Sequence, residues 1–316
     1  MEYAYISSGS FGAQVLQHLD PKPSLVITGI DKLGGRGMKE LIQTPVKKLC
    51  TELHIPYKEV ADKIELAKIV RSDDERQREG ATKQLAKRLL LLCDFGVIVP
   101  SELLHLNEYG IWNIHPSLLP KHRGTTPIQT ALLNGEKVTG VTIMQIDEKI
   151  DHGPIIAQER TEIDINDTNV TLQAKLAEVG ATLVNSKWLR VNGSSETLRP
   201  LDIQTLRPQD HSQATFTKKL TKEDGFVPLN ELAPYLEPIL KKYNLMHLLP
   251  TGSEIRDARY ADVLHNKIRA FTPWPGVWTK LADESVLKIV SSTFEESEKI
   301  FVITEVERNG KKYGCK

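Results

Sequence analysis

Asn113, His115 and Asp151 are the residues whose types and spacing in this sequence could carry out chemistry. The first two lie two positions apart in an apolar stretch, and on an extended strand that spacing places both side chains on one face. An amide can donate to a developing oxyanion, an imidazolium can do so more strongly or move a proton, and a carboxylate can orient the imidazole. A set of this kind suits direct acyl transfer to an amine.

Each of these residues also has a purely structural interpretation. An Asn-x-His pair on a strand is most often a satisfied polar pair, and Asp151 before Gly153-Pro154 also makes a good turn. A third interpretation is a metal site drawn from His105, His115, His122, His152 and Asp151. Their spacing matches no common metal-binding pattern, so we predict no metal site.

The elements that must position these residues begin at the N-terminus. Residues 3–7 have the composition of a strand, residues 8–12 form a small-residue turn, and Val15, Leu16 and Leu19 then follow helical spacing. Strand, turn and helix in this order open a doubly wound α/β fold. Gly9 and Gly12 alone do not make the G-x-G-x-x-G fingerprint, so we favour a tight turn over a nucleotide site.

The same pattern continues along the chain. Further buried strands are expected at residues 25–29, 89–92, 96–99, 141–146 and 155–158, and helices at 63–87 and 168–189 and after the Thr-Pro pairs at 44–45 and 126–127. Residues 94–96 interrupt the apolar run of residues 89–99, so we expect the strand to end near there and a loop to open at the sheet edge. The fold class is therefore α/β with a mostly parallel sheet, and His115 ends a strand where such sheets keep their ligands.

A change of composition marks a second domain. Residues 191–213 are rich in glycine, proline and polar residues and are predicted to be a linker between a domain at 1–190 and a domain at 214–316. Short alternating stretches at 214–220, 277–281, 286–290 and 301–306 predict a small β-rich domain. Residues 229–243 have helical spacing that Pro234 and Pro238 are expected to break.

Composition argues against a membrane-spanning or secreted protein and excludes few other classes. The 316 residues hold 41 basic and 41 acidic side chains, so a polyanionic partner would need a local basic patch. The three cysteines, Cys50, Cys93 and Cys315, show no metal or disulfide spacing, which fits a reducing compartment. No segment has the pattern of a signal peptide or a transmembrane span. We expect a cytoplasmic protein with no membrane association.

One local basic segment lies at residues 31–39. It contains Lys32, Arg36 and Lys39 among three glycines, which do not favour a helix. It could be a solvated connector or a flexible finger for phosphates. Composition alone favours the connector.

Several motifs, taken in order, go beyond these generic patterns. They are Asn113-Ile-His115-Pro-Ser117-Leu-Leu-Pro120, then Arg123-Gly124-x-x-Pro127, Gly140-Val-Thr-Ile-Met144, Asp147 and Asp151-x-Gly153-Pro154, with Ala214 to Gly225 and Ile268 to Gly276 near the C-terminus. Together they resemble the signatures of the folate-dependent formyltransferases, over nearly the whole chain. Within that family they come nearest to the members that formylate methionyl-tRNA.

The resemblance implies a Rossmann-like formyltransferase domain, a smaller OB-like tRNA-binding domain, and specific roles for the residues. Asn113, His115 and Asp151 would be catalytic. The donor, 10-formyltetrahydrofolate, would be held by Phe95, Gly96, Val97 and Ile98 around the pterin and by Ser117, Leu118, Leu119 and Pro120. Lys32, Arg36 and Lys39 would contact the acceptor, initiator methionyl-tRNA. The resemblance therefore favours the phosphate-binding finger over the connector. We expect a monomer that needs no metal.

The chain departs from the family at its C-terminal end. More residues than expected lie between Gly225 and Ile268, and fewer than expected follow Trp278. The second domain is therefore expected to be shortened, with helices inserted at 226–267 that could cover an open sheet edge. Two other functions stay open at this point: formylation of a small amine, such as an amino-sugar nucleotide or glycinamide ribonucleotide, and RNA binding without catalysis.

Overall fold

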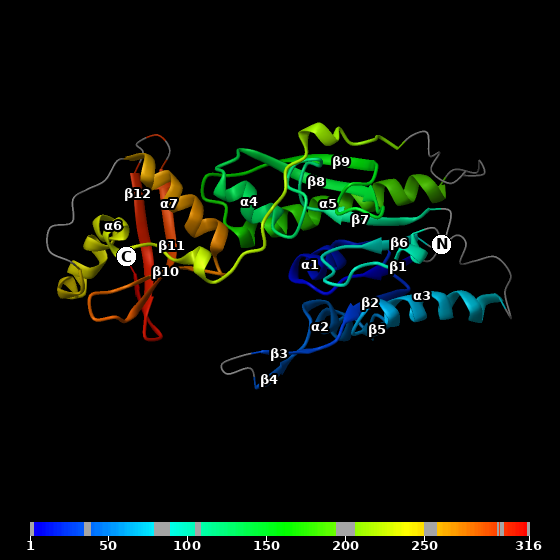
Figure 1. The fold of residues 1–316 in the computed structure, drawn as a ribbon, viewed down its shortest axis with the longest axis horizontal. Coiled ribbons are helices and arrows are strands. Elements are labelled where there is room, and N and C mark those ends of the chain that lie inside the picture. The colour runs from blue at the N-terminus through cyan, green and yellow to red at the C-terminus, as the bar shows by residue number, and fades with distance from the viewer. Residues whose placement is uncertain are drawn as a thin grey trace. The chain divides into compact units, whose positions relative to one another are not determined.

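A seven-stranded sheet of order β5-β2-β1-β6-β7-β8-β9 organises the N-terminal part of the computed structural model (Figure 1). Its strands are β1 (Tyr3–Ile6), β2 (Leu25–Gly29), β5 (Tyr57–Val60), β6 (Leu89–Leu92), β7 (Ile111–His115), β8 (Val138–Gln145) and β9 (Ile155–Glu162). Neighbours from β5 to β7 pair in parallel, and β8 runs antiparallel to β7. Such strands are covered on both faces, which explains the wholly apolar run of β6.

The structure describes residues 3–34, 39–78, 89–104, 109–193, 206–249, 258–295, 297 and 300–314. The chain divides into two compact units that alternate along the sequence. The first consists of Met1–Arg123, Gly140–Thr161 and Ala174–Phe216, and the second of Gly124–Thr139, Glu162–Gln173 and Thr217–Lys316. The domains proposed from the sequence, at 1–190 and 214–316 with a linker at 191–213, stay a prediction.

Five helices expected from the sequence are present in the described chain. They are α1 (Ser10–His18), α2 (Pro45–Glu52), α3 (Lys63–Arg78), α4 (Pro127–Leu133) and α5 (Asn169–Gly193). Both Thr-Pro pairs begin a helix, but they do so differently. The Thr44 side chain accepts a hydrogen bond from Lys47 N and caps α2, whereas the Thr126 side chain makes no cap and instead donates to Lys218 O.

The turn after β1 and the loop after β6 meet where the strand order reverses. Backbone N–H groups of Ser8 and Gly9 donate to Asp94 O at 3.2 and 3.1 Å, and Phe11 N donates to Asp94 Oδ2 at 3.1 Å. A Cβ on Gly9 would lie 1.9 Å from that carboxylate, so this approach requires glycine. Open α/β sheets bind their ligands at such a switch point.

The loop expected to open near residues 94–96 is confirmed, but the strand expected at residues 96–99 is absent. Asp94 has a left-handed backbone, with φ of +47°, and ends the extended run after β6. The chain then leaves the sheet, and Ile98 is 81% exposed. The apolar residues of this segment therefore form a loop at the carboxyl edge, next to the strand that carries Asn113 and His115.

The second unit contains a four-stranded antiparallel sheet of order β10-β11-β12-β13. Its strands are β10 (Val277–Lys280), β11 (Val286–Glu295), β12 (Ile300–Arg308) and β13 (Lys311–Gly314), and its helices include α6 (Leu229–Lys242) and α7 (Ala258–Phe271). Helix α6 lies within the predicted insertion at 226–267, and α7 begins within it and ends beyond it. The α/β class with a smaller β-rich part is confirmed, although β13 was not expected and residues 214–220 form no strand.

Helix α6 runs through both of its prolines, so the predicted break is wrong. Each proline removes one backbone hydrogen bond from the helix. The helix buries a stripe formed by Leu232, Leu236 and Ile239, and this burial outweighs the missing bonds. Tertiary packing here decides the structure against local preference.

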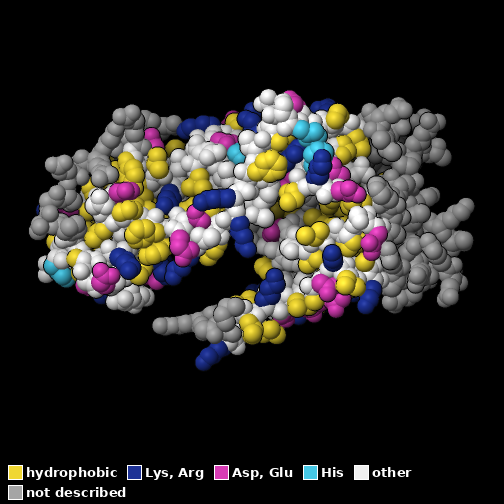
Figure 2. All heavy atoms as spheres, viewed as in Figure 1, with side chains coloured by type: hydrophobic (Ala, Val, Ile, Leu, Met, Phe, Trp, Pro, Cys, Tyr) yellow, Lys and Arg dark blue, Asp and Glu magenta, His cyan; other side chains and the backbone are white. Residues whose placement is uncertain are grey.

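Short elements complete the described chain. A two-stranded ribbon joins β3 (Lys32–Gly34) to β4 (Glu40–Ile42), and 3-10 turns cover Ser101–Leu103, His211–Gln213, Glu223–Gly225 and Met246–Leu248. None of the described helices combines the length and apolarity needed to cross a bilayer. On the face shown in Figure 2, basic, acidic and apolar side chains are interspersed, as expected from equal numbers of the two charges.

Candidate active site

Asn113 and His115 lie on β7, an interior strand of the sheet whose five residues are all buried. Asn113 pairs with Leu92 of β6, and His115 pairs with Thr142 of β8. The side chains are 8% and 5% exposed, and the two-residue spacing puts them on the same face as predicted. The sheet therefore presents an amide and an imidazole together at its carboxyl edge.

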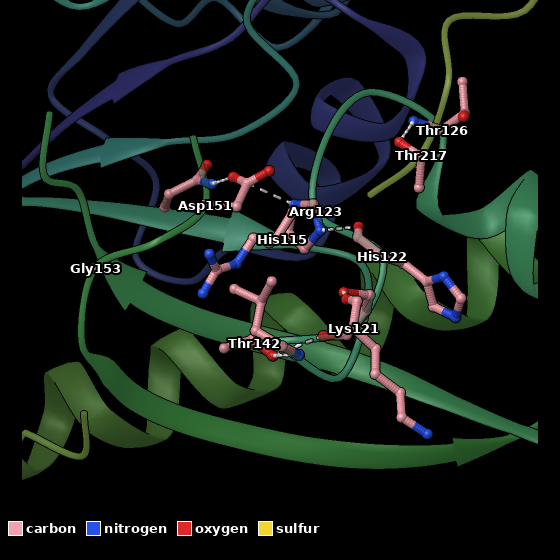
Figure 3. A network of polar contacts seen from close by, with 12 residues as sticks. His115, Lys121, His122, Arg123, Thr126, Thr142, Asp151, Gly153 and Thr217 are labelled. Carbon is pink, nitrogen blue, oxygen red and sulfur yellow. Dashed lines mark hydrogen bonds and ion pairs between the residues drawn. The ribbon is translucent and has the colours of Figure 1, made fainter. Parts of the chain in front are cut away.

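Asp151 reaches this pair from the loop between β8 and β9. Its Oδ1 lies 3.5 Å from Asn113 Nδ2. The same oxygen lies 3.6 Å from His115 Nδ1 (Figure 3). The structure thus brings together all three residues that the sequence singled out. Two potential donors converge on one anionic oxygen, which is the arrangement that a developing oxyanion requires.

The imidazole of His115 is fixed from both sides. Its Nε2 lies 3.0 Å from His122 O, and because a carbonyl can only accept, Nε2 donates. Its Nδ1 faces the Asp151 carboxylate on the opposite side of the ring (Figure 3). The contact of 3.6 Å is longer than a hydrogen bond, and such contacts commonly tighten only when a substrate binds.

Thr142 holds the loop that follows β7. Its Oγ1 donates to Ser117 O at 2.6 Å and accepts from Leu119 N at 3.1 Å and from Gln158 Nε2 at 2.8 Å. The Ser117 hydroxyl donates to Lys121 O at 2.6 Å. The polar groups of this loop are therefore used internally, and its shape is set before any ligand arrives.

The residues expected to contact folate lie on two adjacent loops. Ser117 and Leu119 are buried, Leu118 and Pro120 are half-buried, and all four belong to the loop after β7. The loop after β6 contributes the half-buried Phe95 and Val97 and the exposed Gly96 and Ile98. Strands β6 and β7 are neighbours, so both loops rise from the same part of the sheet edge. Their role in binding folate stays a prediction.

The described part of the expected basic segment contains β3 and leads into β4 of the two-stranded ribbon. Lys32 and Lys39 are exposed, while Arg36 lies outside the described residues. Leu33 and Leu41 pair across the ribbon and are 57% and 66% exposed. The ribbon therefore presents apolar as well as basic side chains to solvent, a combination that composition alone did not indicate.

Sequence reasoning missed a polar network beside Asp151. Arg123 is 3% exposed, and its Nη2 donates to Gln209 Oε1 at 2.6 Å and to His211 Nδ1 at 2.8 Å. His211 stacks on His152 with ring centroids 3.8 Å apart, and His152 Nδ1 lies 2.6 Å from Asp147 Oδ2. No motif indicated these contacts, because Gln209 and His211 lie in the polar segment predicted to be a linker.

The network affects the charge of His211. Partial desolvation in the stack lowers the pKa of His211, and the positive charges of His152 and Arg123 lower it further. This agrees with the geometry, since Nδ1 must be unprotonated to accept from Arg123. Among the described residues, no group of three or more potential ligands could hold a metal ion.

Comparison with known proteins identifies relatives over most of the chain. A sequence model described as formyl transferase matches residues 8–186, and one described as the formyl transferase C-terminal domain matches residues 253–313. Methionyl-tRNA formyltransferase from Kosmotoga olearia is 35% identical over 289 residues, which cover 90% of this chain and 77% of that protein. The protein of the same name from Caldicellulosiruptor saccharolyticus is 30% identical over 286 residues, covering 88% and 76%.

Among solved structures, an N-formyltransferase from Helicobacter canadensis, in complex with folinic acid and dTDP-3-aminofucose, has a TM-score of 0.54. It is 19% identical, and the match covers 99% of this chain and 97% of that one. At this identity the likeness shows the shared fold alone.

The His211 environment predicts a titration below the ordinary histidine pKa of about 6.5. Because the folded state favours the neutral ring, the free energy of unfolding should fall as the pH drops through that value toward the lower folded-state pKa. Histidine-selective NMR titration measures the midpoint directly. In His152→Ala the midpoint should rise, because the stack and a neighbouring positive charge are lost; an unchanged midpoint would contradict this account.

Proposed function

Because the chain belongs to the formyl transferase family, we propose that it transfers the formyl group of 10-formyltetrahydrofolate to the α-amino group of initiator methionyl-tRNA. The product is N-formylmethionyl-tRNA, which serves translation initiation. The methionyl-tRNA formyltransferases related to this chain over most of its length support the acceptor. The observation that carries the chemistry is the convergence of Asn113 Nδ2 and His115 Nδ1 on one oxygen of Asp151.

The reaction begins when the neutral α-amine of the methionyl ester attacks the formyl carbon of the donor. A carbon–nitrogen bond forms, and the formyl oxygen becomes an oxyanion. Asn113 Nδ2 and a protonated His115 donate to that oxygen, in place of the single acceptor they share in the structure. The His122 carbonyl keeps the imidazole oriented through Nε2, and the Asp151 carboxylate stays beside the ring.

Collapse of the tetrahedral intermediate completes the transfer. The bond between the formyl carbon and N10 of the folate breaks, and N10 takes up a proton while the former amine loses one. Asp151 and His115 lie where they can help this proton transfer, directly or through one water. The products are the formamide on methionine and tetrahydrofolate, so atoms and charges balance.

The chain's own hydroxyl and thiol groups favour direct attack over a covalent enzyme intermediate. The Ser117 hydroxyl is committed to Lys121 O at 2.6 Å. Cys50 and Cys93 are buried, and burial raises the pKa of both thiols, to about 11 for Cys50. None of these groups is an activated nucleophile.

The two loops at the carboxyl edge suit a flat, partly apolar donor. The internal bonding around Thr142 gives the loop of Ser117 to Pro120 a fixed shape, and Phe95, Val97 and the exposed Ile98 offer apolar surface beside it. Pockets for heterocycles combine such surface with a few fixed polar groups. The basic side chains of Lys32 and Lys39 at the β3–β4 ribbon, together with Arg36, would meet the acceptor's phosphates. We place the activity in the cytoplasm and expect a monomer.

An acceptor assay tests the function as a whole. Purified protein with 10-formyltetrahydrofolate should formylate methionyl initiator tRNA. It should leave a sugar-nucleotide amine and glycinamide ribonucleotide unmodified, because a basic ribbon serves a polyanion better than a small amine. Transfer to a small amine instead would support the other substrate class. Binding of the tRNA without any transfer would favour a non-catalytic RNA-binding protein.

Asn113→Ala and His115→Ala should each lower kcat by about a hundredfold to a thousandfold, because each removes one preorganised donor to the oxyanion. Thermal unfolding followed by circular dichroism should show that both variants fold. His18→Ala, an exposed histidine at the end of α1, is the matched control and should keep full activity. Near-normal turnover in both variants would contradict the assignment of Asn113 and His115 as catalytic residues.

Arg36→Ala and Lys32→Ala should weaken tRNA binding and leave the KM for the folate donor unchanged. Each phosphate contact that is lost should reduce the slope of log K against log salt by about 0.9. Binding titrations from low to moderate salt measure this slope. Lys68→Ala, which removes an exposed lysine from α3, controls for net charge. An effect confined to folate affinity would refute the role of the ribbon.

A further inference from the structure

Residues 207–215, which include the last part of the predicted linker, are attached to the candidate active site at both ends. Arg207 and Ile155 exchange two backbone hydrogen bonds, of 2.8 and 3.0 Å, at the start of β9. Further along, Thr215 O accepts from Arg123 N at 2.9 Å, and Thr215 Oγ1 accepts from His122 N at 2.8 Å. The stretch between these anchors therefore runs along the site with a fixed path.

Gln209 lies between the two anchors and is 6% exposed. Its amide nitrogen donates to Asp151 O at 3.1 Å and to Gly153 O at 2.7 Å. Its amide oxygen accepts from Arg123 Nη2 at 2.6 Å. The orientation of the amide is unambiguous, because the carbonyls only accept and the guanidinium only donates.

The turn that Gln209 holds needs external support. Asp151 has a left-handed backbone, with φ of +47°, which costs a non-glycine residue free energy. At Gly153 a Cβ would lie 2.0 Å from Gln145 O, so the turn is pressed against the end of β8. Two hydrogen bonds to the carbonyls on either side of His152 keep this crowded turn in one conformation.

We propose that Gln209, held by Arg123, is the positioning residue that sets where the Asp151 carboxylate stands relative to His115 and Asn113. This rests on the proposed function, since it assigns a role within that reaction. Gln209 does not touch the reacting atoms. It acts through the backbone of Asp151, whose carboxylate lies 3.6 Å from His115 Nδ1.

The charges in the network fit this role. Both hydrogen bonds from Arg123 Nη2 go to neutral acceptors, the amide of Gln209 and the imidazole of His211. The guanidinium also stands 5.9 Å from the centre of the Phe216 ring. Arg123 therefore orients Gln209 through a hydrogen bond between the two side chains.

Gln209→Ala should lower kcat by about tenfold to a hundredfold, the loss expected when a catalytic group shifts by a fraction of an ångström to one ångström. The KM values for donor and acceptor should change little, because Gln209 is buried. Gln213→Ala, an exposed glutamine on the same segment, is the matched control and should retain wild-type kcat. A kcat for Gln209→Ala equal to that of Gln213→Ala would overturn the proposal.

A double-mutant cycle with Asp151→Asn separates positioning from a general structural effect. If Gln209 acts through the Asp151 carboxylate, adding Gln209→Ala to Asp151→Asn should cost less than about a twofold further loss in single-turnover rate. A loss as large as in the wild-type background would show that Gln209 acts elsewhere. If Gln209→Ala fails to fold, Gln209→Glu carries the same test, since it keeps the volume and places an oxygen against the two carbonyls.

A readout independent of turnover distinguishes failure of this proposal from failure of the proposed function. The ring nitrogen shifts of His115, followed by NMR with selective labelling, should change in Gln209→Glu and not in Gln213→Ala. Unchanged shifts would overturn the positioning role even in an active enzyme. Absence of formyl transfer by the wild type would overturn the proposed function, while changed shifts would still show that Gln209 places Asp151.

Discussion

The approach of the Asp151 carboxylate to His115 is the interaction on which the candidate site depends. Asn113 and His115, the two residues that this carboxylate approaches, are held by the backbone hydrogen bonds of the sheet, because β7 pairs on both sides and is wholly buried. Asp151 has no such ladder, and it stands on a left-handed turn pressed against Gln145. The sheet therefore fixes Asn113 and His115, whereas the position of Asp151 depends on side chains that hydrogen-bond to its loop.

This division explains what the sequence could predict. A period of two on an apolar strand places Asn113 and His115 together without knowledge of the rest of the chain. Strand ends, Thr-Pro helix starts and the α/β class follow from equally local patterns. Asp151 could be matched to the site only through the resemblance, because no local rule says which of many acids will fold back onto a given histidine.

Other features depended on contacts between distant residues and could not be predicted locally. The Gln209 amide meets carbonyls 58 and 56 positions away, in a segment whose composition is that of a linker. Helix α6 keeps its two prolines because its buried stripe outweighs them. Residues 96–99 have strand composition, but the left-handed turn at Asp94 directs them out of the sheet.

The alternation of the two compact units along the chain limits how the protein can be divided. Within the second unit, His265 Nε2 bonds to Ile165 O at 2.8 Å, and Arg269 donates to the carbonyls of Asp164 and Asp167. Those carbonyls belong to chain that precedes α5, far from the C-terminal sheet in sequence. A chimera that exchanges only the C-terminal residues between relatives would leave Arg269 facing a foreign surface. Grafts of this part should therefore carry residues 124–139 and 162–173 with it.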